Sequence, residues 1–306
     1  MVRSLATPPL PPFPTPRART DKPGRYTGRG AELAVVSEMR ELKEPATMDK
    51  PVLLREHAGG IVTLTLNRPE QFNALSQELL TELEKALAEI AADEDARVVL
   101  IAGAGKAFCA GHDLKEMRVR PDLAFQQALF RQCSRMMMAL TELPQPVIAR
   151  VHGIATAAGC QLVAMCDLAV ASDNARFAVS GINVGLFCST PSVALARNIG
   201  RKQAMEMLLT GDFIDAQTAL ARGLVNRVVA EEKLDAEVKK LSDAILSKSP
   251  VAVSSGKRLF YRQLELGLAE AYDAASDVIA CDMMTEDARE GIDAFIEKRP
   301  PEWRGR

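Results

Sequence analysis

The chain has 306 residues, 47% of them hydrophobic, and a formal net charge of −2 at pH 7. A chain of this size can bury a substantial core, which favours one large α/β domain with a smaller appendage. The nearly balanced charge gives no reason to expect nucleic acid or an anionic membrane as a partner. No apolar run approaches the roughly 18–20 residues of a membrane span, so we expect a soluble protein. The six cysteines form neither a CxxC pair nor a zinc-type cluster, which is typical of thiols in a reducing compartment.

The first fifty residues differ from the rest because they carry eight prolines interleaved with arginines. Such a stretch buries too little apolar surface to offset its chain entropy, so we predict a disordered extension over residues 1–47. Two origins fit it: a translated leader upstream of a natural initiator at Met48, or an arginine-rich transit peptide. The dense prolines do not suit the amphipathic helix of a transit peptide, which favours the leader.

Regular structure is predicted from residue 51 onward. Residues 61–66 alternate apolar and polar side chains, as a half-buried strand does, and Ser76 stands where the N-cap of a helix belongs. Strands separated by helices favour a mainly parallel sheet, and beyond about residue 195 the chain is predicted to be mostly helical. We therefore divide it into a core over 48–250 and a C-terminal helical region over 251–306. The further predicted elements are strands at 98–102, 147–151 and 168–171 and a helix at 157–166.

Six segments spread over residues 52 to about 300 share a pattern with one known family. In chain order they are LNRPEQFNAL, KAFCAGHDLKEM, PVIARVHGIATAAGCQLVAMCDLAVAS, AMEMLLTG, AQTALARGLVNRVV and REGIDAFIEKRPPEW. Together they resemble the crotonase superfamily, the enoyl-CoA hydratases and isomerases. The resemblance implies an α/β fold of the ClpP/crotonase-like type, a spiral of ββα units that forms two nearly perpendicular sheets. It also implies that the C-terminal helical region serves in trimer formation.

The same resemblance implies an oxyanion hole, two backbone N–H groups that grip the carbonyl of an acyl-CoA thioester. By motif, the donors are the N–H groups of His112 and Ala158. A thioester enolate carries negative charge on that oxygen, so fixed donors there stabilise the transition state more than the ground state. The CoA ester is expected to lie against the segment that follows His112 and against one arginine before it. These expected contacts are His112, Asp113, Leu114, Lys115 and Arg68.

The sequence departs from the hydratase pattern at two positions. Gln161 stands where the first family glutamate is expected, and Gly181 where the second is expected. Water addition needs one group to deprotonate water and another to protonate the α-carbon, and neither a glutamine amide nor a glycine does so near neutral pH. Hydratase activity is therefore doubtful, although the family name would assign the chain to the lyases or isomerases.

Other residues could take over part of this chemistry. The His112 side chain could act in the pocket as an acid, a base or a carboxylate partner, or it could cap a surface turn. Asp113 is interpreted as structural, and Cys188 has no neighbour in sequence that would lower its pKa. His152 is interpreted as a structural hydrogen-bonder.

Three functions remain open. The first is altered crotonase chemistry, such as decarboxylation of a malonyl-type CoA, the second a non-catalytic acyl-CoA binder, and the third an oligomeric scaffold. The expected partners are an acyl-CoA of fatty-acid metabolism and copies of the same chain in a trimer or hexamer, with neither nucleic acid nor a membrane. No cofactor is implied, because CoA enters as part of the substrate. The expected location is the cytoplasm, or the mitochondrial matrix if the source is eukaryotic.

Overall fold

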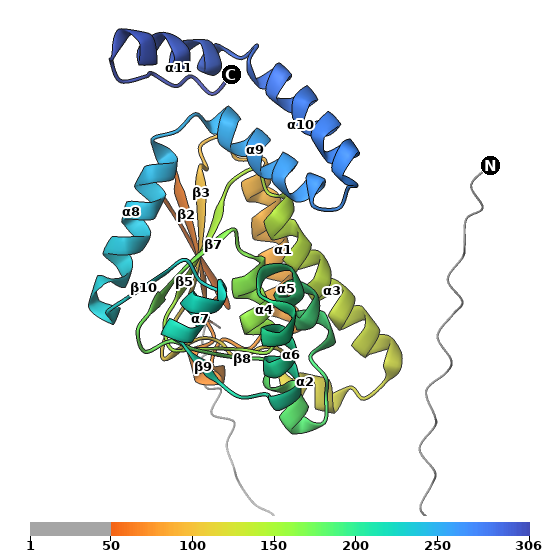
Figure 1. Cartoon of the computed structure of the whole chain (residues 1–306). Coiled ribbons are helices and arrows are strands. Elements are labelled where there is room, and N and C mark those ends of the chain that lie inside the picture. Colours follow the sequence, from red (N-terminus) through yellow and green to blue (C-terminus); the bar gives the residue numbers. More distant parts are fainter. Residues whose placement is uncertain (1–49) are drawn as a thin grey trace, which may run out of the picture. The chain divides into compact units, whose positions relative to one another are not determined.

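The computed structural model describes residues 50–306 (Figure 1). The predicted extension over residues 1–47 and the proposed initiator Met48 lie outside this range. The described part contains two sheets, a layer of helices packed between and around them, and a C-terminal group of helices.

The larger sheet has six strands in the order β1-β2-β3-β5-β7-β10. β1 pairs with β2 in antiparallel fashion, and every later neighbour pair is parallel. This confirms the predicted mainly parallel sheet, because each parallel neighbour is reached through a crossover that includes a helix. The strands are β1 (Leu53–Ala58), β2 (Ile61–Leu66), β3 (Val98–Gly103), β5 (Val147–Val151), β7 (Leu168–Ser172) and β10 (Arg227–Val229).

The smaller sheet has the order β4-β6-β8-β9 and is made of very short strands. β4 pairs with β6 and β6 with β8 in parallel, whereas β9 closes the edge in antiparallel fashion. The carboxyl ends of β4 and β6 lead into the segments that carry the two predicted oxyanion donors. Its strands are β4 (Ala107–Cys109), β6 (Ile154–Thr156), β8 (Arg176–Ala178) and β9 (Ile214–Asp215).

The main core lies between the sheets and the central helices. Ser76 caps α1 by accepting a hydrogen bond from the Leu79 amide at 3.2 Å, as predicted, and the apolar face of α1 is fully buried. α3 packs against α1, and α4 packs against α3 and α5 (Figure 1). The helices of this layer and its connections are η1 (Pro69–Gln71), α1 (Gln77–Ala91), α2 (Leu114–Val119), α3 (Leu123–Glu142), α4 (Ala158–Met165), η2 (Ser180–Val184), α5 (Ser189–Asn198), α6 (Arg201–Thr210) and α7 (Ala216–Arg222).

A buried ion pair fastens the C-terminal helices to the core. The Lys257 ammonium on α9 donates to Asp167 at 2.7 Å and to two backbone carbonyls, and the Tyr261 hydroxyl donates to the same aspartate. α10 and α11 lie beyond α9 in Figure 1 and pack against it. The elements of this part are η3 (Glu231–Lys233), α8 (Leu234–Leu246), α9 (Pro250–Gln263), α10 (Leu268–Asp282) and α11 (Glu286–Glu297).

Most predicted elements agree with the structure within a residue or two. The strand at 61–66 and the strand at 147–151 have the predicted bounds, and the predicted helix at 157–166 is α4 with its two cap residues. The region beyond residue 195 is mostly helical as predicted, but it also contains β9 and β10. These strands have only two and three residues, too few to show an alternating pattern.

Candidate active site

A largely apolar cavity of about 510 Å³ lies where the smaller sheet meets α3, α4 and the chain around η2. It contains several of the residues singled out in the sequence, namely His112, Leu114, Ala158, Gly181 and Cys188. Its other walls are mostly aliphatic and aromatic, which suits an acyl chain better than a sugar or a nucleotide. They comprise Ala110, Met117, Phe130, Ala157, Ser180, Val184, Leu186, Phe187, Ser189, Thr190 and Pro191.

The backbone N–H of His112 is directed away from the neighbouring chain. A short parallel bridge joins this segment to Leu75, which donates to the Gly111 carbonyl at 2.7 Å and accepts from the Asp113 amide at 3.2 Å. Because successive peptide groups of an extended chain face opposite sides, the N–H of His112 lies on the side away from Leu75. Within residues 50–306 this N–H has no hydrogen-bond acceptor, so it is free to bind a ligand oxygen.

The second predicted donor, the N–H of Ala158, is the first amide of α4. Amides in the first turn of a helix have no acceptor within the helix, and the dipole adds partial positive charge there. Ala157 precedes it with φ 51° and ψ −119°, a conformation that costs a residue with a side chain on the order of 1–3 kcal/mol. This strained turn aims the start of α4 at the cavity.

Gly111 brings the two donor segments together. A Cβ built on Gly111 would lie 3.1 Å from the Ala158 nitrogen and 2.9 Å from the Ala157 Cβ, and the residue has φ +90°. Only glycine tolerates both the crowding and the left-handed backbone. The structure therefore places the residue before His112 in contact with the start of α4, as the predicted oxyanion hole requires.

The His112 side chain lines the same cavity and stacks edge-on against Phe130, with 5.0 Å between ring centroids. Its Nε2 atom is buried and has no hydrogen-bond partner among the described residues. Burial lowers the pKa of this imidazole to about 4, so the ring is neutral at physiological pH. The alternative of a surface turn with the ring in water does not agree with this position.

Asp113 and Arg68 form a structural pair beside the cavity. The Asp113 carboxylate caps α2 through the amides of Lys115 and Glu116 and accepts a hydrogen bond from the Arg68 guanidinium at 2.9 Å. Desolvation alone would raise the pKa of Asp113, but the hydrogen bonds from Arg68 and the α2 amides outweigh it and keep the pKa below its usual value. Asp113 thus holds the His112 segment in place, in line with its structural interpretation.

The predicted CoA contacts separate into two groups. Leu114 lines the cavity and Lys115 is exposed beside it, so both are open to a ligand. Arg68 is tied to Asp113 and also donates to the Ala74 carbonyl, which leaves it less available for a phosphate. His152 is likewise held, with Nε2 bonded to the Gly105 carbonyl at 2.9 Å, as a structural histidine would be.

Gln161 and Gly181, which replace the two expected glutamates, lie in different surroundings. Gln161 lies one turn along α4 from Ala158, is 4% exposed, and has an Oε1 atom with no hydrogen-bond partner within residues 50–306. Gly181 lines the cavity and donates its N–H to the Cys188 sulfur at 3.3 Å. A Cβ on Gly181 would lie 2.7 Å from both the Cys188 sulfur and the Leu186 carbonyl oxygen, so the site has no room for a side chain there.

Few ionisable groups reach this cavity. Among the described residues, its lining includes no Asp, Glu, Lys or Arg side chain, and its titratable members are His112 and Cys188. Burial raises the pKa of the Cys188 thiol, which makes it a poor nucleophile. Sequence reasoning missed Phe130 and the Leu186–Phe187 wall, because an apolar residue of a helix or loop gives no sign of which cavity it faces.

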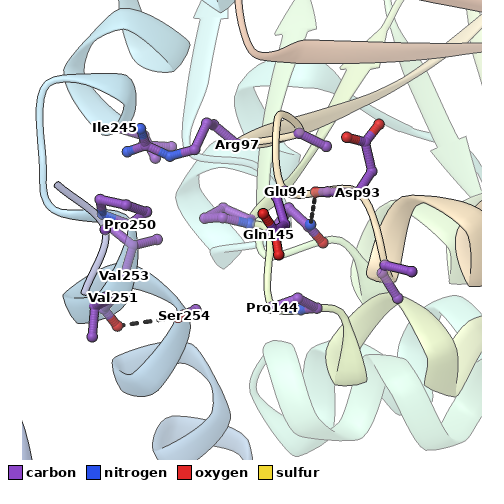
Figure 2. Close-up of a pocket in the computed structure, with 15 residues that line it drawn as sticks. Asp93, Glu94, Arg97, Pro144, Gln145, Ile245, Pro250, Val251, Val253 and Ser254 are labelled. Carbon is purple, nitrogen blue, oxygen red and sulfur yellow. Dashed lines mark hydrogen bonds between the residues drawn. The ribbon is translucent and has the colours of Figure 1, made fainter.

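A second cavity, of about 390 Å³, lies between the end of α1, the start of β3 and the start of α9 (Figure 2). Figure 2 shows Gln145 between Asp93 and Glu94 on one side and Pro250 and Val251 on the other. None of the predicted site residues lines it. Over residues 50–306, no group of three or more His, Cys, Asp or Glu residues is arranged to hold a metal ion. No helix in that range is long and apolar enough to cross a membrane.

The fold and this cavity define a protein of the crotonase class. Residues 56–306 match the family model described as enoyl-CoA hydratase/isomerase, and the chain belongs to that family. It is 46% identical over 252 residues to enoyl-CoA hydratase domain-containing protein 3, mitochondrial, of Xenopus laevis, covering 82% of this chain and 85% of that protein.

Solved structures agree with this assignment. A crystal structure of an enoyl-CoA hydratase from Mycobacterium smegmatis is 58% identical, with a TM-score of 0.82, covering 83% of this chain and 99% of that one. The human enoyl-CoA hydratase domain-containing protein 3 is 44% identical with a TM-score of 0.81, covering 83% of this chain and all of that one. By their sequence alone, the segments HGIATAAGCQLVA and GINVGLFCSTPSVALAR predict a resemblance to this protein and its bacterial relatives, and the comparisons confirm it.

Proposed function

We propose that the chain binds an acyl-CoA thioester and polarises its carbonyl, but adds water to an enoyl-CoA very slowly. The carbonyl oxygen would lie between the N–H groups of His112 and Ala158, with the acyl chain in the apolar cavity. One observation carries the proposal: two backbone N–H groups without an acceptor within residues 50–306 meet at a cavity whose described lining has no carboxylate. Oxyanion donors of this kind are each worth about 3 kcal/mol of barrier when the reaction builds charge on oxygen.

Hydration needs acid–base groups in addition to the oxyanion hole. General acid–base groups contribute on the order of 10²–10⁴-fold each, and neither the Gln161 amide nor Gly181 supplies one. The His112 imidazole is neutral at physiological pH, and its low pKa makes it a weak base for this purpose. The family name alone therefore overstates the hydratase activity expected of this chain.

Decarboxylation of a malonyl-type CoA is a weaker candidate. Its carboxylate would enter a cavity whose described lining offers no Lys or Arg side chain. Burying a carboxylate without a cation is costly. The site favours an uncharged acyl group, which supports the acyl-CoA binder over the decarboxylase.

The first test measures binding and turnover side by side. Calorimetric titration with butyryl-CoA, which cannot be hydrated, is expected to show saturable binding. Crotonyl-CoA, followed by loss of enoyl absorbance, is expected to show a hydration rate orders of magnitude below that of an active family hydratase assayed in parallel. Absence of butyryl-CoA binding would overturn the binding site, and a rate comparable to that hydratase would overturn the proposed loss of hydration.

Two variants, each with one of the expected glutamates restored, extend this test. Gln161→Glu changes a buried side chain of similar size next to Ala158, whereas Gly181→Glu collides with Cys188 and the Leu186 carbonyl. We expect Gln161→Glu to keep butyryl-CoA binding and to raise crotonyl-CoA hydration measurably. Gly181→Glu is expected to lose binding and stability because the 180–190 segment must move.

We also propose assembly into a trimer or hexamer through the C-terminal helices. Large apolar side chains are exposed along α10 and α11 in the single chain, which is typical of surfaces that become buried in an oligomer. Light scattering coupled to size-exclusion chromatography tests this: a monomer at micromolar concentration would refute it. The side chains concerned are Leu268, Tyr272, Ile279, Met283, Met284, Phe295 and Ile296.

The proposed location in the cell depends on the source organism. Several relatives carry the word mitochondrial in their names, whereas matching structures include bacterial proteins. We propose the cytoplasm in a bacterium and the mitochondrial matrix in a eukaryote, with an acyl-CoA of fatty-acid metabolism as the bound molecule.

A further inference from the structure

The His112 imidazole lines the proposed acyl pocket, yet no hydrogen bond holds it. The Nε2 atom of the ring is buried away from water and has no hydrogen-bond partner within residues 50–306. The contrast with His152 is direct, because both ring nitrogens of His152 have partners, the Gly105 carbonyl and the Arg150 guanidinium. His152 is held as a structural residue, whereas His112 is a buried polar group without a partner, which is unfavourable unless something binds it.

The other polar side chains of the cavity already have partners, except Thr190, whose hydroxyl is not among the fully buried atoms. The Ser180 hydroxyl is hydrogen-bonded to Thr156 at 2.8 Å, and the Ser189 hydroxyl donates to the Phe187 carbonyl at 3.3 Å. The Cys188 sulfur accepts the Gly181 amide at 3.3 Å. Nε2 of His112 is therefore the one polar side-chain atom of this described lining that is buried without a partner, and it gains most from a polar atom on a ligand.

We infer that the His112 side chain selects acyl groups that carry a neutral hydroxyl close to the thioester. The inference rests on the proposed acyl-CoA site and adds its specificity. The imidazole and the proposed backbone donor belong to the same residue, so the ring lies within one side-chain length of the bound carbonyl. A hydroxyl on the third or fourth acyl carbon is thus within reach, whereas one at the far end of a long chain is not.

The choice of a hydroxyl follows from the chemistry of the ring. A neutral imidazole has one donor and one acceptor nitrogen, and a hydroxyl can pair with either of them. A carboxylate would need a positive partner that the described lining lacks. A saturated or enoyl chain would leave the imidazole unpaired. Turning the ring toward the ligand breaks no hydrogen bond, because it makes none within the described part of the chain.

The experiment compares three CoA esters by calorimetric titration of the full chain: butyryl-CoA, 3-hydroxybutyryl-CoA and 4-hydroxybutyryl-CoA. At least one hydroxylated ester is expected to bind about tenfold more tightly than butyryl-CoA, the gain of one satisfied buried hydrogen bond. His112→Leu is expected to bring the ratio of hydroxylated-ester affinity to butyryl-CoA affinity down to about one. This ratio within the variant is the readout, because His112 lies in the proposed binding site. His57→Leu, outside the cavity, serves as the control and is expected to keep the preference.

The outcomes separate this inference from the proposed function. If no ester binds, the proposed acyl-CoA site fails. If butyryl-CoA binds as tightly as both hydroxylated esters, only the inference fails, and a preference that survives in His112→Leu also refutes it. A readout on the native protein remains if the variant does not fold: the preferred hydroxylated ester should shift the His112 imidazole NMR signals more than butyryl-CoA does, and equal shifts would count against the inference.

Discussion

The first turn of α4 rests directly on the end of β4 through Gly159 and Cys109. A Cβ built on Gly159 would lie 2.0 Å from the Cys109 carbonyl oxygen and 2.8 Å from the Cys109 Cβ. This contact fixes how far the amide of Ala158 lies from the segment that begins at Gly111, because Cys109 precedes that segment by two residues. The spacing of the two proposed oxyanion donors thus depends on a helix residue that has no side chain.

Replacement of Gly159 by alanine is expected to damage both stability and binding. The methyl group has no room, so β4 and α4 must separate, and overpacking of this kind costs about 1–3 kcal/mol. Urea unfolding and butyryl-CoA titration measure the two effects, and we expect affinity to fall at least tenfold. The matched control is Gly256→Ala in α9, where a Cβ meets nothing within 4 Å and should add about 0.5–1 kcal/mol of stability. A Gly159→Ala protein that binds normally would show that this contact does not set the donor spacing.

Replacing the strained residue Ala157 at the start of α4 is expected to increase stability, whereas Gly159→Ala decreases it. Ala157 adopts φ 51° and ψ −119°, which glycine accepts without steric cost. We expect Ala157→Gly to raise the free energy of unfolding by about 1 kcal/mol, after the greater chain entropy of glycine is subtracted. Thermal and urea unfolding test this. A loss of stability would mean that the Ala157 methyl makes contacts worth more than the strain.

Lys257 is expected to be indispensable to the attachment of the C-terminal helices. Its ammonium has three acceptors, and its side chain is 6% exposed. Lys257→Met leaves the Asp167 carboxylate without its cation, and breaking a buried pair in this way costs about 3–5 kcal/mol. Lys239→Met removes an exposed pair with Asp243 and should change stability by less than about 0.5 kcal/mol. Similar urea midpoints for the two variants would contradict the assignment of Lys257 as the main anchor of α9.

His112 should make the protein less stable at acid pH. Its pKa is about 4 in the folded chain against 6.5 ordinarily, because burial disfavours the charged ring. As the pH falls from about 6.5 to 4, the unfolded chain takes up a proton that the folded chain refuses, so this group contributes a loss of about 3 kcal/mol in the free energy of unfolding. Carboxylates also titrate in this range, so the measurement is the difference between the native protein and His112→Gln. The variant should lose less stability on acidification. Equal losses, or an NMR titration of His112 near 6.5, would contradict the burial of the ring.

The periodicity and capping signals of the sequence predicted part of the local structure. The strand at 61–66, the cap at Ser76 and the helix at 157–166 depend on residues close together in the chain, and all three were predicted. The family resemblance also located the cavity segments around His112, Ala158 and Gly181, because motifs keep their order along the chain. The short strands β4, β6, β8, β9 and β10 were missed, since strands of two or three residues owe their existence to the neighbouring strand rather than to their own pattern. β1 was also missed, because five of its six residues are exposed and it shows no alternation.

Only the tertiary structure decided how these segments meet. Arg68 and Asp113 are 45 residues apart, and nothing local showed that they pair rather than bind CoA. The fit of Gly159 against Cys109 is likewise a contact between distant segments, and the lack of a partner for His112 Nε2 within residues 50–306 depends on all of its neighbours. The crowding of Gly181 by Cys188 is closer in sequence, but it depends on how the 180–190 segment folds back on itself. Sequence by itself determined which residues line up along each helix and strand. Packing decided which of them share a cavity, because burial and unpaired polar atoms are properties of the assembled neighbours and not of any single stretch of chain.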